Sequence, residues 1–244
     1  MQSLTKYIFN SLNSDFHYHG FGRDGIRYLE NPSTLYFVDN HIKYKDESLY
    51  KYFENFISKY PNSNYCVIGK DINETKRLLN DFNPVGIGEV KIYKKYYDSD
   101  NIMREYSNIE FLKELCKLDN DLPIFLHYDI TTYNYHTLED IIKYNQNRKF
   151  VLCHCGMNEI FNKHVAWDVS RKLQSKYSNL WLDVSWVTIE YFENNRKNLS
   201  NLDNCRLLLG SDNNSLNQDY NINNLSKYIN NEINSRILFK TTVQ

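Results

Sequence analysis

Eight short apolar runs, nearly all separated by segments of helical periodicity, constrain the fold of this chain more than any other feature. They lie within residues 7–19, 34–38, 65–69, 85–92, 122–127, 150–156, 180–186 and 205–212. Short, continuously apolar runs are typical of parallel strands that are buried on both faces. Eight such β/α units in 244 residues predict an α/β fold, a (β/α)8 TIM barrel. An open doubly wound sheet is the alternative, but no glycine-rich phosphate loop supports it.

We expect residues 1–244 to form a single barrel domain, because no linker or low-complexity tract interrupts the pattern. Between the runs, Asp71 and Glu74 have the spacing of a helix N-cap and its capping-box partner. Residues 93–106, rich in tyrosine and polar side chains, are expected to form a loop, either a lid or a plain surface loop. Cys153 and Cys155 are expected to point outward, toward the helices.

Charge and cysteine usage exclude several classes of protein. The net charge of −1 is not typical of a nucleic-acid or membrane-surface binder. The five cysteines are scattered and show no C-x-x-C spacing, which indicates buried free thiols in a reducing compartment. With no signal peptide and no run of about 18 apolar residues, we expect a soluble, cytoplasmic protein.

Polar side chains end five of the eight apolar runs. They are His17, His19, Glu89, Lys91, His127, His154 and Asp212. In an extended strand alternate side chains share a face, so the two histidines of the first run would point the same way. The active site of a parallel barrel lies at the carboxyl ends of its strands, where all of these side chains would meet. Imidazoles and carboxylates are ligands of Zn²⁺, and also of Mn²⁺, Fe²⁺ or Ni²⁺.

This set resembles the metal-dependent amidohydrolase superfamily, whose pattern is H-x-H on strand one, Lys or Glu on strand four, His on strands five and six, and Asp on strand eight. Residues 122–127, 151–156, 179–185 and 209–212 are similar to its amidohydrolase-related (amidohydrolase 2) branch. Residues 86–89, Gly-Ile-Gly-Glu, are similar to the TatD-like hydrolases, but Ser211 stands where that family has an acidic residue. Domains of the polymerase-and-histidinol-phosphatase type also begin with H-x-H but usually end with Asp-x-His, unlike residues 212–214 here.

The resemblance implies a site with one or two divalent metal ions, Zn²⁺ first among them. His17, His19 and Asp212 would hold one ion, and Glu89, or a carboxylated Lys91, would bridge to a second ion on His127 and His154. In a one-metal site His17, His19, His127 and Asp212 would be the ligands, and His154 would assist catalysis. Asp212 would accept the proton of the attacking water. A simple Glu89–Lys91 salt bridge is the alternative for that pair.

Three further residues are candidate substrate contacts. Arg23 could bind an anionic group or be a solvated loop residue. Trp186 could stack on substrate or pack in the core. Tyr128 follows His127 and could line the pocket. Asp129, beside it, could also line the pocket.

We interpret the chain as a metal-dependent hydrolase of a small-molecule ester, lactone or amide. The alternatives are a TatD-like phosphodiesterase acting on DNA, a decarboxylase of the amidohydrolase-related branch, and a barrel without catalytic activity. No membrane or nucleic-acid partner is expected, and a homo-oligomer stays open.

Overall fold

The computed structural model describes about two thirds of the chain, including most of the sheet and its helices. The described residues are 15–18, 21–22, 25–26, 34–38, 49–61, 63–98, 100–157, 163–185, 187–195, 206–210, 225–229, 234 and 238–239.

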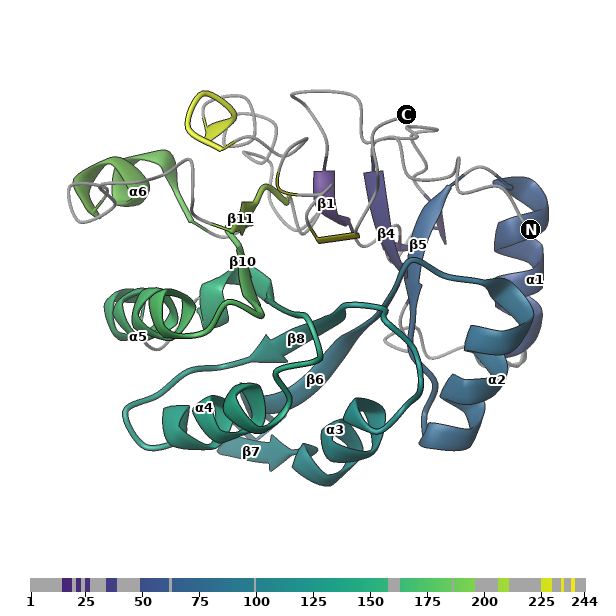
Figure 1. The fold of residues 1–244 in the computed structure, drawn as a ribbon, viewed down its shortest axis with the longest axis horizontal. Coiled ribbons are helices and arrows are strands. Elements are labelled where there is room, and N and C mark those ends of the chain that lie inside the picture. Colours follow the sequence, from purple (N-terminus) through teal and green to yellow (C-terminus); the bar gives the residue numbers. More distant parts are fainter. Residues whose placement is uncertain are drawn as a thin grey trace.

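Eight parallel strands follow one another in chain order across the main sheet (Figure 1). They are β1 (Asp15–Tyr18), β4 (Thr34–Val38), β5 (Asn64–Val67), β6 (Gly86–Tyr97), β8 (Ile124–Tyr128), β9 (Phe150–Leu152), β10 (Leu180–Asp183) and β11 (Leu207–Leu208). A doubly wound sheet would reverse its strand order at a switch point, and this sheet does not. The predicted strands are therefore confirmed as a parallel half-barrel. The described strand pairs include none between β11 and β1, so closure into a complete (β/α)8 barrel stays a prediction.

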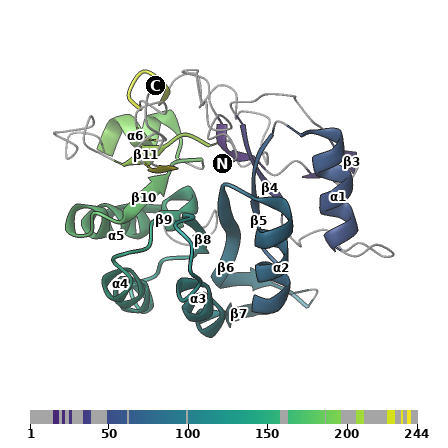
Figure 2. The same ribbon diagram turned by 45° about the vertical axis from the view of Figure 1, so that its right-hand side comes forward.

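Helices cover the outer face of this curved sheet (Figure 2). They are α1 (Leu49–Lys59), α2 (Ile72–Phe82), α3 (Ile109–Cys116), α4 (Tyr135–Tyr144), α5 (Lys163–Lys176) and α6 (Ile189–Asn195). The predicted N-cap of α2 is confirmed, because the Asp71 carboxylate accepts a hydrogen bond of 2.9 Å from the Glu74 N–H. A short antiparallel pair, β2 (Phe21–Gly22) and β3 (Gly25–Ile26), lies apart from the main sheet.

Alternation along the strands divides the core into two layers. Ile124, Leu126 and Tyr128 pack with the helices in the outer layer, whereas Phe125 joins a second cluster on the inner face of the half-barrel. Cys153 belongs to this inner cluster and Cys155 to the outer layer. The expectation that both cysteines point outward was therefore wrong for Cys153, which continues the inward alternation of β9.

The predicted loop at residues 93–106 is instead a β-hairpin. β6 continues to Tyr97 and pairs antiparallel with β7 (Met103–Ser107). The Asp98 carboxylate closes the turn by accepting hydrogen bonds from the Asp100 and Ile102 N–H groups, at 3.0 and 2.9 Å. Every residue of β7 is exposed, so no apolar alternation marks this strand in the sequence. Among the helices that the structure describes, none combines the length and the apolar character needed to cross a bilayer.

Candidate metal centre

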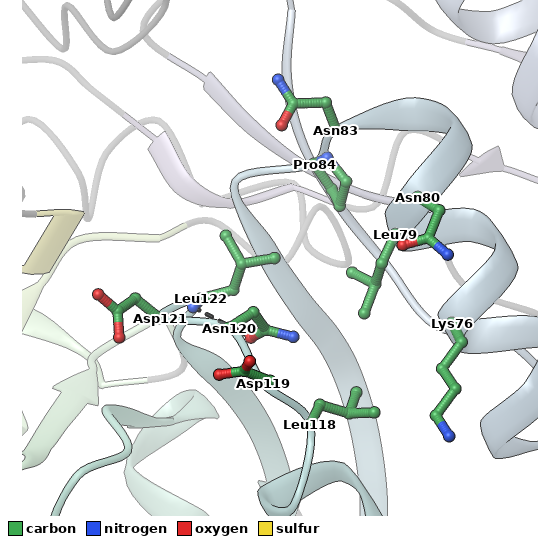
Figure 3. Close-up of a pocket in the computed structure, with 10 residues that line it drawn as sticks. All are labelled: Lys76, Leu79, Asn80, Asn83, Pro84, Leu118, Asp119, Asn120, Asp121 and Leu122. Carbon is green, nitrogen blue, oxygen red and sulfur yellow. Dashed lines mark hydrogen bonds between the residues drawn. The ribbon is translucent and has the colours of Figure 1, made fainter.

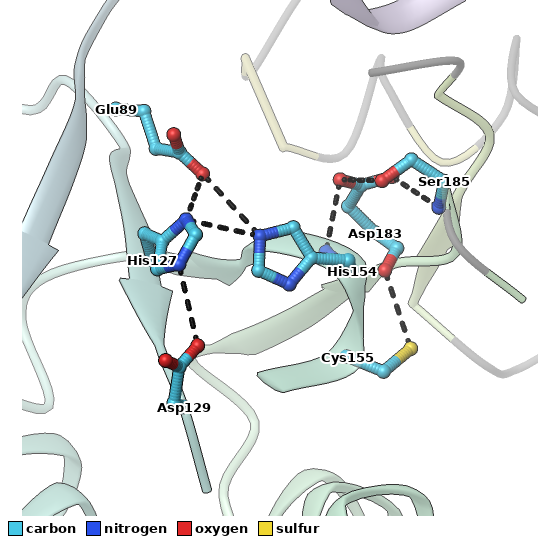
Figure 4. Close-up of polar contacts among 7 residues, drawn as sticks. All are labelled: Glu89, His127, Asp129, His154, Cys155, Asp183 and Ser185. Carbon is cyan, nitrogen blue, oxygen red and sulfur yellow. Dashed lines mark hydrogen bonds and ion pairs between the residues drawn. The ribbon is translucent and has the colours of Figure 1, made fainter. Parts of the chain in front are cut away.

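Glu89, His127 and His154 converge on one buried point (Figure 4). His127 and His154 come from the carboxyl ends of β8 and β9, and Glu89 comes from within the long strand β6. The Glu89 Oε1 atom lies 3.0 Å from His127 Nδ1 and 3.5 Å from His154 Nε2. The two ring nitrogens, His127 Nδ1 and His154 Nε2, are 3.1 Å apart. All three residues are at least nine-tenths buried. The sequence-predicted residues of strands four, five and six are thus brought together by the fold.

Glu89 faces the inner side of the half-barrel because β6 is irregular at Gly88. Ile87 and Val90 both pack in the outer layer although they are three residues apart, and the β6–β8 register shifts between them. Regular alternation from Ile87 would turn Glu89 outward. Gly88 has a φ of +144°, and a Cβ there would come within 2.8 Å of the Phe125 carbonyl oxygen. Only glycine fits this irregularity, which turns the carboxylate toward the two histidines.

His127 lies on the inner face of β8 and is held from two sides. Its Nδ1 faces the Glu89 carboxylate, and its Nε2 lies 3.2 Å from Asp129 Oδ1. Burial lowers the pKa of His127, but the Glu89 and Asp129 carboxylates outweigh burial and raise that pKa to about 9. Asp129 also accepts a hydrogen bond of 3.0 Å from the Lys95 N–H, which ties the β6–β7 hairpin to the site.

His154 reaches the inner side from a turn and not from a strand. β9 ends at Leu152, and residues Cys153–Gly156 form a 3-10 turn, η2. The backbone of His154 has φ 39° and ψ 35°, in the left-handed region. Because Leu152 packs outward, a straight continuation of β9 would have pointed His154 outward as well. The turn redirects its imidazole toward His127.

The three donor atoms fit a divalent metal ion. Zinc–nitrogen distances of about 2.1 Å place any two ligands of a tetrahedral ion about 3.4 Å apart. The observed separations of 3.0, 3.1 and 3.5 Å agree with that edge length. The Asp129 carboxylate gives His127 the outer partner that metal-bound imidazoles commonly have, and it favours a proton on Nε2, which leaves Nδ1 for a metal. A carboxylate with two imidazoles, and no thiolate, is typical of a catalytic site.

Most of the other predicted site residues have side chains that the structure does not describe. His17 is on β1, whose side chains are not described, and His19, Asp212, Arg23 and Trp186 lie outside the described residues. Lys91 is half-buried and pairs in register with His127 across β6 and β8.

Tyr128 does not face the cluster. It packs fully buried in the outer layer, where its hydroxyl donates a hydrogen bond of 2.8 Å to the Asn134 carbonyl oxygen. This position follows from alternation, since Tyr128 neighbours the inward-facing His127 on β8, so the predicted substrate contact is not supported.

Sequence reasoning gave two carboxylates of this site too little weight. The sequence pattern predicts Asp129 only as a pocket-lining residue, and it does not distinguish Asp183, at the end of β10. Asp183 accepts hydrogen bonds from the His154 N–H at 3.2 Å and from the Ser185 N–H at 2.9 Å. Both acids end or follow an apolar strand, which is the same signal that identified the histidines.

Two cavities accompany this arrangement. One of about 210 Å³ is lined by residues that include Glu89, Lys91, Tyr106, Asn108 and Phe111. A larger one of about 480 Å³ lies between the end of α2 and the loop that precedes β8, near the amino ends of the strands (Figure 3). The lining of the larger cavity includes none of the clustered residues, and that of the smaller one includes Glu89 but neither histidine.

Comparisons with known proteins leave the family open. No family model matches the sequence. The GATA zinc finger domain-containing protein 4 of Dictyostelium discoideum is 30% identical over 129 residues, which are 53% of this chain and only 22% of that protein. Two crystal structures of 2,6-dihydroxybenzoate decarboxylase, one from Rhizobium and one complexed with 2,6-dihydroxybenzoate, align at 15% identity with TM-scores of 0.45 and 0.44. Each alignment covers 78% of this chain and 75% of the other. The activities in these names belong to those proteins.

Proposed function

We propose that this chain is a metal-dependent hydrolase that acts on a small-molecule ester, lactone or amide. The observation that carries the proposal is the buried convergence of one carboxylate and two imidazoles, Glu89, His127 and His154, beside the carboxyl ends of β8 and β9. The carboxyl ends of parallel strands are where this architecture places catalysis. The resemblance of the strand-end residues to the amidohydrolase superfamily supports the same conclusion.

Zn²⁺ is the first candidate ion, with Mn²⁺, Fe²⁺ and Ni²⁺ as alternatives for the same donors. A divalent ion at this site would acidify a water molecule and polarise the bond under attack. Neighbouring residues of the chain keep the proposed ligands in position. Asp129 orients the His127 ring, and the buried setting strengthens electrostatic interactions within the site.

Further roles belong to the predicted residues of the other strands. We propose that His17, His19 and Asp212 complete the ligand set, for one ion or for two, with Asp212 as the acceptor of the proton from the attacking water. Glu89, whose Oε1 atom lies beside both His127 and His154, is a proposed ligand of the ion on these histidines and the proposed bridge to the other ion. A carboxylated Lys91 is the alternative bridge.

The charge of the chain favours a small-molecule substrate over a nucleic acid. The net charge of −1 offers no bulk attraction for a nucleic-acid backbone. Lactones, esters and amides of small molecules are therefore the substrates to test first.

The test combines metal analysis with a substrate panel. Purified protein is expected to bind one or two equivalents of Zn²⁺ or Mn²⁺ and to hydrolyse at least one lactone, ester or amide. The double variant His127→Ala, His154→Ala should lose one metal equivalent and the activity. His136→Ala, which removes an exposed imidazole from α4, is the matched control and should keep both.

Retention of all metal by the double variant would reject the proposed site. Release of CO2 from an aromatic or enoic acid, without hydrolysis of any panel member, would replace hydrolysis by decarboxylation. Cleavage of single-stranded DNA would replace the small-molecule substrate.

A further inference from the structure

His154 lies in an unusual backbone segment that the rest of the fold must hold in place. His154, Cys155 and Gly156 all have positive φ, at 39°, 54° and 68°. Residues with a Cβ atom disfavour the left-handed region, and two of them in succession are rarer still. Such conformations persist where the surroundings over-determine them, and they cluster at functional sites. The contacts that hold this segment therefore bear on the metal centre directly.

Asp183 holds the segment from the neighbouring strand (Figure 4). Its Oδ2 atom accepts a hydrogen bond of 3.2 Å from the His154 N–H, so the carboxylate acts on the residue whose ring faces His127. The backbone carbonyl of the same residue lies 3.2 Å from Cys155 Sγ. Asp183 is itself 1% exposed, and it ends β10, which pairs in register with β9. Its position is thus fixed by the sheet and not by a mobile loop.

Both oxygens of the Asp183 carboxylate accept hydrogen bonds. Oδ1 accepts from the Ser185 N–H at 2.9 Å, and Oδ2 accepts from the Ser185 hydroxyl at 3.0 Å and from His154. An asparagine at this place would have one accepting oxygen and one NH2 group. Either orientation of its amide would set that NH2 group against a backbone N–H, of His154 or of Ser185. Only a carboxylate satisfies both sides.

We propose that Asp183 is a positioning residue of the metal centre, which sets the direction of the His154 imidazole through the His154 backbone. The inference rests on the proposed function, because it takes Glu89, His127 and His154 as metal ligands. The Asp183 carboxylate acts on the backbone N–H of His154. Its effect on the metal comes through the left-handed turn.

The test measures Co²⁺ binding to the full chain, with the metal ion alone as the probe. Asp183→Asn is expected to weaken Co²⁺ binding by about 10- to 100-fold, the usual effect of losing an outer partner of a ligand. The visible absorption bands of bound Co²⁺ should change as well, since these bands report coordination geometry. A residue with a purely structural role would leave those bands unaltered.

Asn179→Ala supplies the matched control at the opposite end of β10. The Asn179 side-chain amide donates to the carbonyl oxygens of Ile142, Asn145 and Arg148, so its loss weakens the same region of the fold away from the metal centre. This variant should unfold more readily than wild type but keep the wild-type Co²⁺ affinity and absorption bands. Loss of Co²⁺ affinity in Asn179→Ala equal to that in Asp183→Asn would overturn the positioning role.

The outcomes separate this inference from the proposed function. Wild-type affinity and bands in Asp183→Asn, together with loss of binding in His154→Ala, would reject the positioning role and leave the metal site standing. Absence of specific Co²⁺ binding by the wild-type chain would reject both. If Asp183→Asn does not fold, Ser185→Ala takes its place, with an expected loss of about 2- to 10-fold for one hydrogen bond. Unchanged Co²⁺ binding in Ser185→Ala would then overturn the proposal.

Discussion

Replacing Gly156 with alanine should destabilise the protein by about 2–5 kcal/mol. Gly156 has a φ of +68°, where an alanine costs about 1–2 kcal/mol relative to the right-handed region. A Cβ atom there would also lie 2.6 Å from Ile130 Cδ1, 2.7 Å from Ile130 Cγ1 and 3.0 Å from the Tyr128 carbonyl oxygen. Ile130 is buried, and overpacking of this kind costs about 1–3 kcal/mol more. A domain of ordinary stability would lose about a third of its free energy of unfolding.

Urea unfolding at equilibrium measures this loss, and a double-mutant cycle separates its two causes. Ile130→Ala removes both side-chain atoms that would clash, and by itself it should cost about 2–5 kcal/mol through the cavity that it leaves. In the double variant the steric part disappears and the backbone part remains, so the two costs should fall short of additivity by about 1–3 kcal/mol. Simple additivity would refute the steric argument. A cost below about 1 kcal/mol for Gly156→Ala alone would refute the assignment of this residue to the left-handed turn.

Four further predictions test the site and its frame. Asp129→Asn should weaken Co²⁺ binding by about 10- to 100-fold, because His127 loses its carboxylate partner; an unchanged titration would contradict this. In the metal-free protein the raised His127 pKa contributes stability that is fully present below its unfolded value near 6.5 and is lost as pH rises through about 9. Metal binding displaces the same proton from His127. The increase in Tm on adding metal should therefore grow between pH 6.5 and 9. An increase in Tm that becomes smaller over this pH range would contradict the prediction. Arg206→Ala should cost about 2–4 kcal/mol in urea unfolding, since its guanidinium donates to the carbonyl oxygens of Leu180, Gln174 and Tyr177. The exposed Arg104–Asp98 pair should contribute under about 1 kcal/mol when Arg104 is replaced.

The sequence was sufficient for the strands and their order, for a physical reason. Parallel strands covered by helices must be apolar on both faces, so each one leaves a short, continuous apolar run. Short connections through a helix then bring each strand beside the one before it, which produces the observed sequential order. Burial of the main sheet therefore produces a pattern of apolar runs that can be recognised in the sequence.

The β6–β7 hairpin left no comparable mark. Its strand β7 is exposed at every residue, and the facing part of β6 consists of tyrosines and lysines. Without a buried face there is no apolar alternation to detect. The pairing is held instead by the backbone ladder, by the turn at Asp98 and by contacts such as the 2.6 Å ion pair between Lys95 and Glu105. Polar contacts of this kind have no distinctive spacing in a sequence.

In the metal centre, too, one residue could be placed from the sequence and two could not. His127 follows the regular alternation of β8, so its inward direction could be derived from the sequence once the strand was recognised. Glu89 and His154 could not be placed in this way, because regular alternation would turn both outward. Each faces inward because of a departure from regular geometry beside a glycine: the register shift at Gly88 and the left-handed turn that ends at Gly156. The polar residues near the strand ends are the candidates for the metal centre. The irregular backbone at these two glycines turns the Glu89 and His154 side chains toward His127. Substitution of either glycine should therefore impair metal binding although neither carries a side chain that could ligate an ion.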